Sequence, residues 1–325
     1  MKGAASHAAG AGCRPGRARS CRSPRAPGGR VSKALLPVEA SGDADGVLEC
    51  VVNVSEGRDP HVLGELAAAC RPCLLDVHSD SHHHRSVFTI AGPEGPVAAA
   101  VRALARLVVA KLDLRGHAGA HPRLGTLDVV PWVALRGRPL RDAPAGAGAE
   151  RALAARDDFA RWVAEELEVP VFLYGPERSL PQLRRDAWGR LSPDLGPGAP
   201  HPAAGSVAVG CRRLMVAYNL WMAEPDLARA REVAAAVRSP AVRALAFLLG
   251  REVQVSCNLV EPLVVGPAQV WDQVAALAPV ARAELVGLVP EAVLAAVPED
   301  RWPELDLSPG QTIERRLGQV SPELK

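Results

Sequence analysis

The 325-residue chain has no apolar run close to the roughly 20 residues that a membrane-spanning helix needs. Its formal net charge is only +2, which argues against a dedicated nucleic-acid-binding protein. Nucleotide binding has no support, because there is no P-loop and Gly146–Gly148 is only a fragment of the dinucleotide fingerprint. There is also no GxSxG elbow to indicate acyl-enzyme chemistry. These absences leave a globular protein without a membrane or nucleic-acid partner.

The seven cysteines have no metal-ligand spacing. Cys70 and Cys73 form the one CxxC pair, at the end of an expected helix that leads into a strand. A redox pair has the opposite context, with the strand before it and the helix after it. We therefore expect buried cysteines that act as small apolar residues, in a reducing, cytoplasmic compartment.

Residues 1–45 differ in composition from the rest of the chain. Arginine alternates there with Gly, Pro, Ser and Ala, and no acidic residue precedes Glu39. Such a segment cannot bury enough apolar surface to fold, so we expect a disordered extension. An organellar transit peptide is the alternative, although the Gly and Pro content disfavours an amphipathic helix.

From residue 47 onward the sequence alternates between strand and helix patterns. Asp59 followed by Pro60 is typical of a helix start. The predicted elements are a strand at 48–54, a helix from 60 to about 70, strands at 74–78 and 86–91, a helix at 96–112 and a strand at 127–135. This β-α-β-β-α-β order is a split ferredoxin-like unit. A helix through Phe159 and Val163 and a strand at 171–174 follow it.

The same order then recurs. Its predicted elements are a strand at 214–220, a helix at 226–237, strands at 244–249 and 252–259, a helix at 267–277 and a strand at 283–288. The sequence therefore predicts an α/β protein, an α+β sandwich of two tandem ferredoxin-like subdomains, 46–214 and 215–325. Ligands favour crevices between such units. The Pro- and Gly-rich connector 192–205 is expected to cross or line that crevice.

Two histidines, His117 and His121, lie between the predicted helix at 96–112 and the strand at 127–135. The glycines around them and Pro122 exclude a regular helix, so the imidazoles are on a loop. Loops on a rigid scaffold often contain catalytic groups. A tight turn with two solvated histidines is an equally good interpretation of this stretch by itself.

A second histidine group lies between the strands at 74–78 and 86–91. Its spacing resembles no tetrahedral metal arrangement, and neighbouring residues of a strand point to opposite faces. We therefore expect no metal there. The group consists of His78, His82, His83 and His84, with Asp76 and Asp80.

Arg85 directly follows these histidines, and its planar guanidinium suits a carboxylate ligand. A surface salt bridge is an equally good interpretation from spacing alone. Asn53 and Glu56 lie where the first strand ends and turns, a place where cap and turn roles are ordinary.

Taken together, these stretches resemble the glutamate formiminotransferase family. The blocks that carry the resemblance are 48–57, 75–78 with 85–89, 117–128, 169–175, 193–197, 210–219, 254–258 and 284–290. They occur in order between about residues 47 and 318.

The resemblance implies a transferase that moves the formimino group of N-formimino-L-glutamate to N5 of tetrahydrofolate, during histidine breakdown. It also implies two α/β subdomains with folate between them, a homodimer, and no metal. His121 matches the catalytic histidine. The folate-binding stretch matches Gly196, Pro197, Gly198, Ala199, Pro200, His201, Pro202, Ala203, Ala204 and Gly205.

One imidazole that titrates near neutrality can take the proton from N5 and give one to the departing glutamate nitrogen. For the donor substrate, we expect Arg85 to pair with a carboxylate, Asn53 to contribute to the site, and His117 to position or tune His121.

The chain departs from the family in three places. Ala118 and Ala120 replace charged residues that often flank the second glycine of the loop, and the folate stretch has lost its aromatic residues. The segment between Tyr174 and Pro193 is also shorter than in animal members. Two alternatives therefore stay open, namely a different one-carbon donor and a folate-binding module without catalysis.

Overall fold

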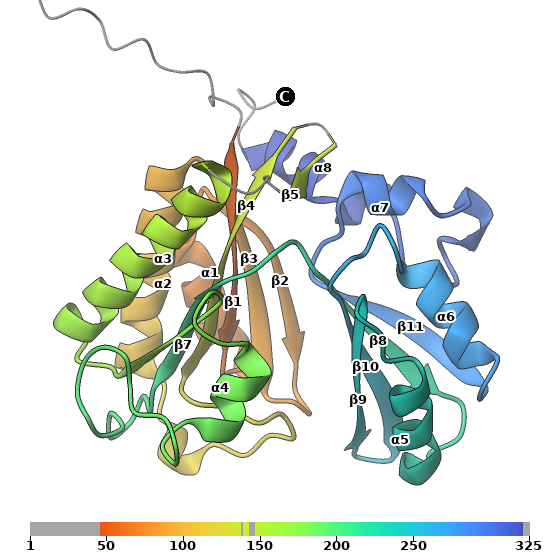
Figure 1. Ribbon diagram of the computed structural model, residues 1–325, viewed down its shortest axis with the longest axis horizontal. Helices are drawn as coiled ribbons and strands as arrows, with labels where there is room; N and C mark the ends of the chain where they lie inside the picture. Colours follow the sequence, from red (N-terminus) through yellow and green to blue (C-terminus); the bar gives the residue numbers. More distant parts are fainter. Residues whose placement is uncertain (1–45, 138, 143–146, 321–325) are drawn as a thin grey trace, which may run out of the picture. The chain divides into compact units, whose positions relative to one another are not determined.

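The computed structural model describes residues 46–137, 139–142 and 147–320 (Figure 1). These residues belong to one compact unit, Gly42–Lys325. The extension predicted at 1–45 lies outside the described residues. Within the described ranges, every helix is too short or too polar to cross a membrane.

The first sheet has the strand order β2-β3-β1-β4-β7-β6, and β5 pairs with β4. The pairs among β1 to β4 are antiparallel, whereas β7 lies parallel to both β4 and β6. The strands are β1 (Val47–Val54), β2 (Leu74–Asp80), β3 (Arg85–Gly92), β4 (Leu127–Arg136), β5 (Arg141–Asp142), β6 (Val171–Tyr174) and β7 (Val207–Cys211).

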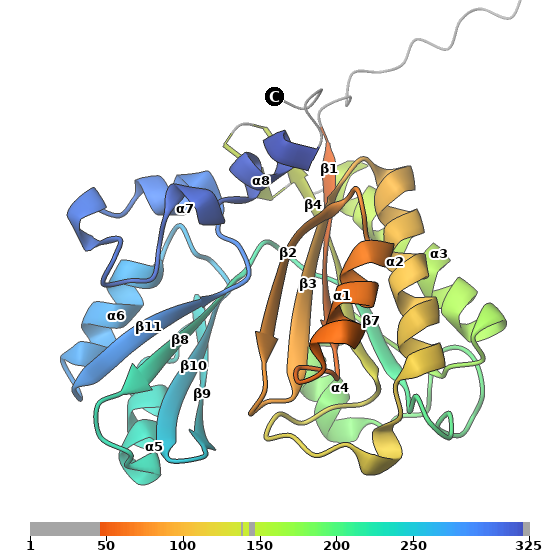
Figure 2. The same ribbon diagram turned by 180° about the vertical axis from the view of Figure 1, so that it is seen from behind.

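Three helices cover one face of this sheet, namely α1 (Pro60–Ala69), α2 (Glu94–Lys111) and α3 (Ala147–Glu166) (Figures 1 and 2). The sequence of β1 explains why the helices pack on this face, because every second residue of the strand is apolar. Leu48, Cys50, Val52 and Val54 are all fully buried in the core beneath these helices, as period-two alternation requires. On the opposite face, helix α8 (Ile313–Val320) packs at one end of the sheet, where Ile313 and Leu317 share a core cluster with Val47 of β1 and Ala91 of β3.

The second sheet has the order β11-β8-β10-β9, and all its pairs are antiparallel. Helices α5 and α6 pack on one face, over a core that includes Val253, Val255 and Cys257 of β10. The elements are β8 (Val216–Met222), α5 (Leu227–Ala236), β9 (Val242–Leu249), β10 (Glu252–Leu259), α6 (Pro267–Ala275) and β11 (Val280–Val286). The chain continues through α7 (Glu291–Ala295), the 3-10 turns Glu299–Arg301 and Pro309–Gln311, and α8 (Ile313–Val320).

Both sheets confirm the predicted fold class. In each, the first and third strands of a β-α-β-β-α-β unit are neighbours at the centre, which is the ferredoxin-like arrangement. The sequence did not predict β7 or helix α4 (Leu180–Asp186), both of which are short. The boundary at 214/215 stays a prediction.

The connector at 192–205 does not cross from one sheet to the other. The chain passes between the sheets at residues 212–215, directly after β7. The connector is held against the histidine loop instead, where Gly125 and Gly205 form an antiparallel bridge. Of the two roles expected for the connector, only a lining role remains.

The histidine loop and the connector meet at a contact that only glycine fits. Thr126 N donates to Ala204 O at 2.9 Å, and Ser206 N donates to Leu124 O at 3.0 Å. A Cβ added at Gly125 would lie 2.0 Å from Ser206 O and 2.6 Å from Ala204 O. The backbones of the two segments can therefore touch only because position 125 has no side chain.

We expect Gly125→Ala to lower the free energy of unfolding by about 1–3 kcal/mol, because overpacking forces the two backbones apart. Gly116→Ala is the matched control, since a Cβ there meets nothing within 4 Å. It should change stability by less than about 0.5 kcal/mol. Denaturant unfolding of both variants measures the difference, and equal stabilities would contradict the close approach.

Candidate active site

The predicted site residues gather on the face of the first sheet that α1, α2 and α3 leave uncovered. Asn53 comes from the end of β1 and Arg85 from the start of β3. Arg85 Nη2 and Nε donate to Asn53 Oδ1 at 2.6 and 3.1 Å. These two residues are brought together by strand pairing, because β1 and β3 are antiparallel neighbours.

Asp128 is the buried acidic partner of this group. Its carboxylate is fully buried, and Oδ2 accepts from Arg85 Nη1 at 2.5 Å and from Arg184 Nη2 at 2.7 Å. Oδ1 accepts from Leu124 N at 2.8 Å. Burial alone would raise the pKa of Asp128, but the two guanidinium groups hold it below its usual range. Arg85 therefore forms a buried ion pair, not the surface salt bridge that the sequence also allowed.

Arg184 could not be identified from the sequence, because its helix, α4, is too short to be predicted from periodicity. The residue lies in a short run between Pro181 and Asp186 that has little helical periodicity. Besides its bond to Asp128, Arg184 Nη1 donates to Pro122 O at 3.0 Å. Arg184 thus ties α4 to the residue that follows His121.

His121 is half-buried beside this ion cluster. Its Nδ1 lies 2.6 Å from Pro122 O and 3.1 Å from Arg85 Nη1. A carbonyl oxygen only accepts hydrogen bonds and a guanidinium only donates them, so the two contacts require opposite tautomers of the ring. The shorter contact, to Pro122 O, places the ring proton on Nδ1. Nε2 then carries the free lone pair, which is the arrangement of a general base.

The surroundings of His121 favour the neutral ring. Burial, followed by the positive charges of Arg85 and Arg184, lowers the pKa of His121 to about 3, although Asp128 and Pro122 O act in the opposite direction. The imidazole is therefore uncharged at neutral pH. This corrects the expectation that His121 titrates near neutrality. With so low a pKa the ring has a free lone pair but is a weak base, because a general base is most effective when its pKa lies near the operating pH.

The second sheet also contributes to this site. Phe247 of β9 lies against His121, with ring centroids 6.2 Å apart, and makes an edge contact with His83 at 5.4 Å. His83 is buried, and its Nε2 lies 3.4 Å from Oε1 of Gln254 on β10. Phe247 could not be identified from the sequence, because an apolar residue in a strand gives no sign of which layer it contacts.

His117 contacts His84 and Arg123, so its expected role of positioning or tuning His121 would act through other residues. Its ring stacks on His84 with centroids 4.0 Å apart, and it contacts Arg123. Arg123 Nη2 in turn donates to His121 O at 2.6 Å. The structure thus links His117 to His121 through Arg123, and through His84 and its neighbour His83, whose ring centroid lies 5.9 Å from that of His121.

The other histidines have separate partners. His78 Nε2 lies 3.2 Å from Glu284 Oε1 on β11, while His84 lies 3.6 Å from Glu56. Within the described ranges, no group of three or more His, Cys, Asp or Glu side chains is arranged to hold a metal ion.

The folate stretch predicted at Gly196–Gly205 forms a turn that closes on itself. His201 and Gly205 exchange backbone hydrogen bonds of 2.8 and 2.9 Å, and His201 Nδ1 accepts from Ala204 N at 2.9 Å. Its last residues contact the histidine loop, since Leu114 N donates to Ala203 O at 2.8 Å. The structure therefore brings this stretch to the same loop as His121.

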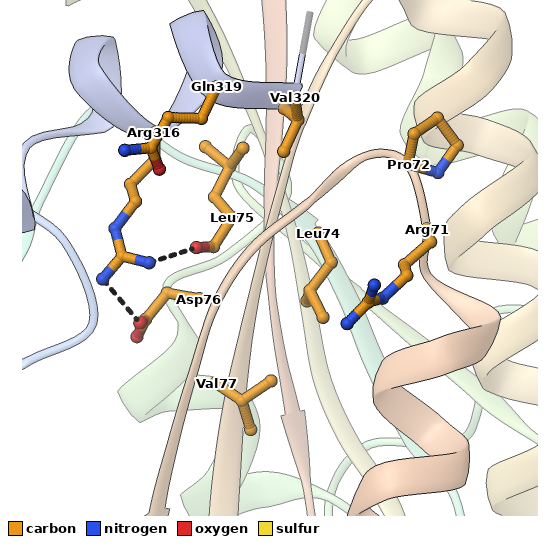
Figure 3. Close-up of a pocket in the computed structure, with 9 residues that line it drawn as sticks. All are labelled: Arg71, Pro72, Leu74, Leu75, Asp76, Val77, Arg316, Gln319 and Val320. Carbon is orange, nitrogen blue, oxygen red and sulfur yellow. Dashed lines mark hydrogen bonds and ion pairs between the residues drawn. The ribbon is translucent and has the colours of Figure 1, made fainter.

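A separate pocket of about 520 Å³ lies at the outer edge of β2, next to α8 (Figure 3). Arg316 reaches into it and contacts Leu75 O at 3.5 Å and Asp76 at 3.9 Å. This pocket shares no residue with the site around His121. It is lined by Arg71, Pro72, Leu74, Leu75, Asp76, Val77, Arg316, Gln319 and Val320.

The CxxC pair is buried in the core, as predicted. Cys70 and Cys73 are both free thiols. Burial raises the pKa of Cys70 to about 12, so the thiolate needed for redox chemistry does not form near neutral pH.

Comparison with known proteins identifies the family. Residues 47–212 match the model of the formiminotransferase domain, N-terminal subdomain. The chain belongs to the formiminotransferase family. It is 31% identical to glutamate formimidoyltransferase of Streptococcus pyogenes serotype M1 over 211 residues, which is 59% of this chain and 68% of that protein. It is 29% identical to the enzyme of the same name from Thermoplasma acidophilum over 308 residues, 83% of this chain and 97% of that protein.

Longer relatives match as well. Formimidoyltransferase-cyclodeaminase of Sus scrofa is 32% identical over 286 residues, or 75% of this chain. The chain spans about half the length of the animal formimidoyltransferase-cyclodeaminases that it matches.

We expect the His121 ring to stay neutral between pH 5 and pH 8, where an ordinary histidine titrates, because its pKa is about 3. In Arg184→Gln the pKa of His121 should rise, since a cation that opposes protonation is removed. NMR titration of the histidine ring resonances measures the pKa of His121 in the unaltered protein and in Arg184→Gln. Arg185→Gln is the control, because Arg185 pairs with Asp186 at the surface. Titration of His121 near pH 6.5 in the unaltered protein would contradict the burial of the ring beside Arg85 and Arg184.

Glu284 joins the two sheets through His78, and its Oε2 also accepts from Trp221 Nε1 at 2.9 Å and Asn219 Nδ2 at 3.1 Å. Burial would raise the pKa of Glu284, but these hydrogen bonds lower it to about 2. Burial would lower the pKa of His78, but Glu284 raises it above 6.5. The stabilisation by Glu284 is thus present above pH 4.5 and lost as the pH falls toward 2. The stabilisation by His78 is fully present below pH 6.5 and is lost as the pH rises through the raised pKa of His78.

Glu284→Gln should therefore lower the free energy of unfolding most between pH 4.5 and 6.5, by about 1–3 kcal/mol, and less at pH 8.5. Denaturant unfolding across this range measures the effect. Glu252→Gln serves as the control, because Glu252 contacts Arg282 at the surface of the same sheet. A loss that does not vary with pH would disprove the charged pair.

Proposed function

We propose that the chain is a glutamate formimidoyltransferase, which moves the formimino group of N-formimino-L-glutamate to N5 of tetrahydrofolate. One observation carries the proposal. The loop that holds His121, with its Nε2 lone pair free, is bridged through Gly125 to the connector that matches the folate stretch of the family. A histidine degradation pathway, a cytoplasmic location and a homodimer belong to the same proposal.

In the proposed mechanism, N5 attacks the formimino carbon and forms a tetrahedral intermediate. Nε2 of His121 takes the proton that N5 loses. The ring is neutral at physiological pH, and a substrate carboxylate on Arg85 is proposed to offset the positive charge that lowers the pKa of His121 and so to make the ring a stronger base. The same nitrogen then gives this proton to the glutamate nitrogen as the C–N bond breaks. His121 ends the reaction in the neutral state in which it began.

The charges around His121 suit an anionic substrate. Arg85, Arg123 and Arg184 surround a single fully buried carboxylate, Asp128, so positive charge is in excess there. Of the five N–H groups of Arg85, three are used by Asn53 and Asp128. Nη1 also lies 3.1 Å from His121 Nδ1. The second N–H of Nη2 is proposed to bind a carboxylate of formiminoglutamate, with Asn53 fixing the guanidinium plane and His117 supporting the loop through Arg123.

The proposal is tested by an assay with formiminoglutamate and tetrahydrofolate that follows 5-formiminotetrahydrofolate. His121→Ala should lower kcat by about 10²- to 10⁴-fold, which is the usual contribution of a general acid–base. Binding of 5-formyltetrahydrofolate, a stable folate, should change little. His61→Ala is the control, since His61 is an exposed histidine on α1.

Two outcomes would contradict the proposal. Normal turnover by a folded His121→Ala protein would remove His121 from the mechanism. An inactive unaltered protein that still binds 5-formyltetrahydrofolate would indicate another one-carbon donor or a binding module. Activity and folate binding must be measured side by side, because the uncharged Ala118 and Ala120 near His121 replace charged residues of the family.

A further inference from the structure

The connector that is proposed to hold folate has no aromatic side chain that could stack on a flat ring. Its one ring, His201, already accepts hydrogen bonds from Ala203 N and Ala204 N. Folate has a pterin and an aminobenzoyl ring, and flat rings of this kind are commonly bound by stacking on aromatic side chains. A stacking surface for folate must therefore come from another element.

Trp188 is the one aromatic residue among the large apolar side chains that are exposed in the described ranges, at 37%. It lies just past α4, with φ of +64°. This left-handed conformation favours glycine and is costly for a bulky side chain. Strained residues of this kind gather at binding and active sites, where the surrounding structure holds them in place.

The indole ring of Trp188 is fixed from two sides. The indole makes a T-shaped contact with the ring of Phe172 of β6, at a centroid distance of 5.2 Å and an angle of 88°. Its Nε1 donates to Ser206 Oγ at 3.3 Å. A ring held in one orientation before ligand binding loses little conformational freedom when a ligand stacks on it.

Trp188 lies beside the junction of the connector and the histidine loop, where its Nε1 contacts Ser206 Oγ. Ser206 directly follows the connector, and its backbone N donates to Leu124 O in the histidine loop. Arg184, four residues before Trp188, contacts Pro122 O. The partner of Trp188, Phe172, packs with Val129 of β4 in a cluster covered by Leu183 of α4.

This cluster lies on the face of the first sheet that α1, α2 and α3 leave uncovered. Asn53 pairs with Val129 in the β1–β4 register, which places the predicted site on the same face. The exposed indole and the catalytic loop are therefore on one side of the sheet.

We propose that Trp188 is a stacking surface for one of the two flat rings of the folate co-substrate. The inference rests on the proposed function, and it adds a binding residue outside the connector.

Calorimetric titration with 5-formyltetrahydrofolate tests this inference without turnover. Trp188→Leu should weaken binding about tenfold, because stacking is lost, whereas Trp188→Phe should keep most of the affinity. In the assay, Trp188→Leu should raise KM for tetrahydrofolate and leave kcat within about threefold. The control is Trp162→Leu, a half-buried tryptophan on α3 beneath Arg106.

Titration with a tetrahydropterin and with p-aminobenzoylglutamate then identifies the ring. A fall in affinity for either fragment in Trp188→Leu supports the inference. Unchanged binding of 5-formyltetrahydrofolate by a folded Trp188→Leu protein would overturn it and leave the proposed function intact. Failure of the unaltered protein to bind 5-formyltetrahydrofolate would overturn both.

Discussion

The buried carboxylate of Asp128 is the constraint on which the site depends. It is inaccessible to solvent and lies between Arg85 of β3 and Arg184 of α4, while Leu124 N donates to its second oxygen. Removing one partner of a buried ion pair leaves an uncompensated charge, which is strongly destabilising. Through this one group, a sheet strand, the histidine loop and an added helix hold each other in place.

The groups that position His121 also set its protonation. Arg184 and the His121 ring share the carbonyl of Pro122, which fixes the tautomer and leaves Nε2 free. The guanidinium groups that hold the loop around Asp128 also oppose a positive charge on the ring, so the pKa of His121 falls to about 3. Geometry and basicity are therefore not independent here, and a substrate carboxylate that neutralises Arg85 would raise the basicity of the same ring.

The sequence was sufficient for the parts of the fold that local patterns determine. Alternation in Leu48–Val54 and helical periodicity through Val97, Val101 and Leu104 predicted two β-α-β-β-α-β units, and both are present. The pairing of β7 with β4 could not be predicted, because a short parallel strand gains its stability from distant partners. Arg184 and Phe247 were missed for the same reason, since each reaches His121 or its loop only through long-range packing.

The second sheet therefore takes part in the chemistry proposed for the first. Burial is the largest cause of the lowered pKa of His121, and Phe247 of β9 lies against the ring. His83, which contacts both rings, is joined to Gln254 of β10, and His78 is joined to Glu284 of β11. Contacts far from the reacting atoms thus help keep water from the imidazole. Any movement that separated Phe247 from His121 would hydrate the ring and raise its pKa, so the basicity of His121 depends on how closely the two sheets stay together.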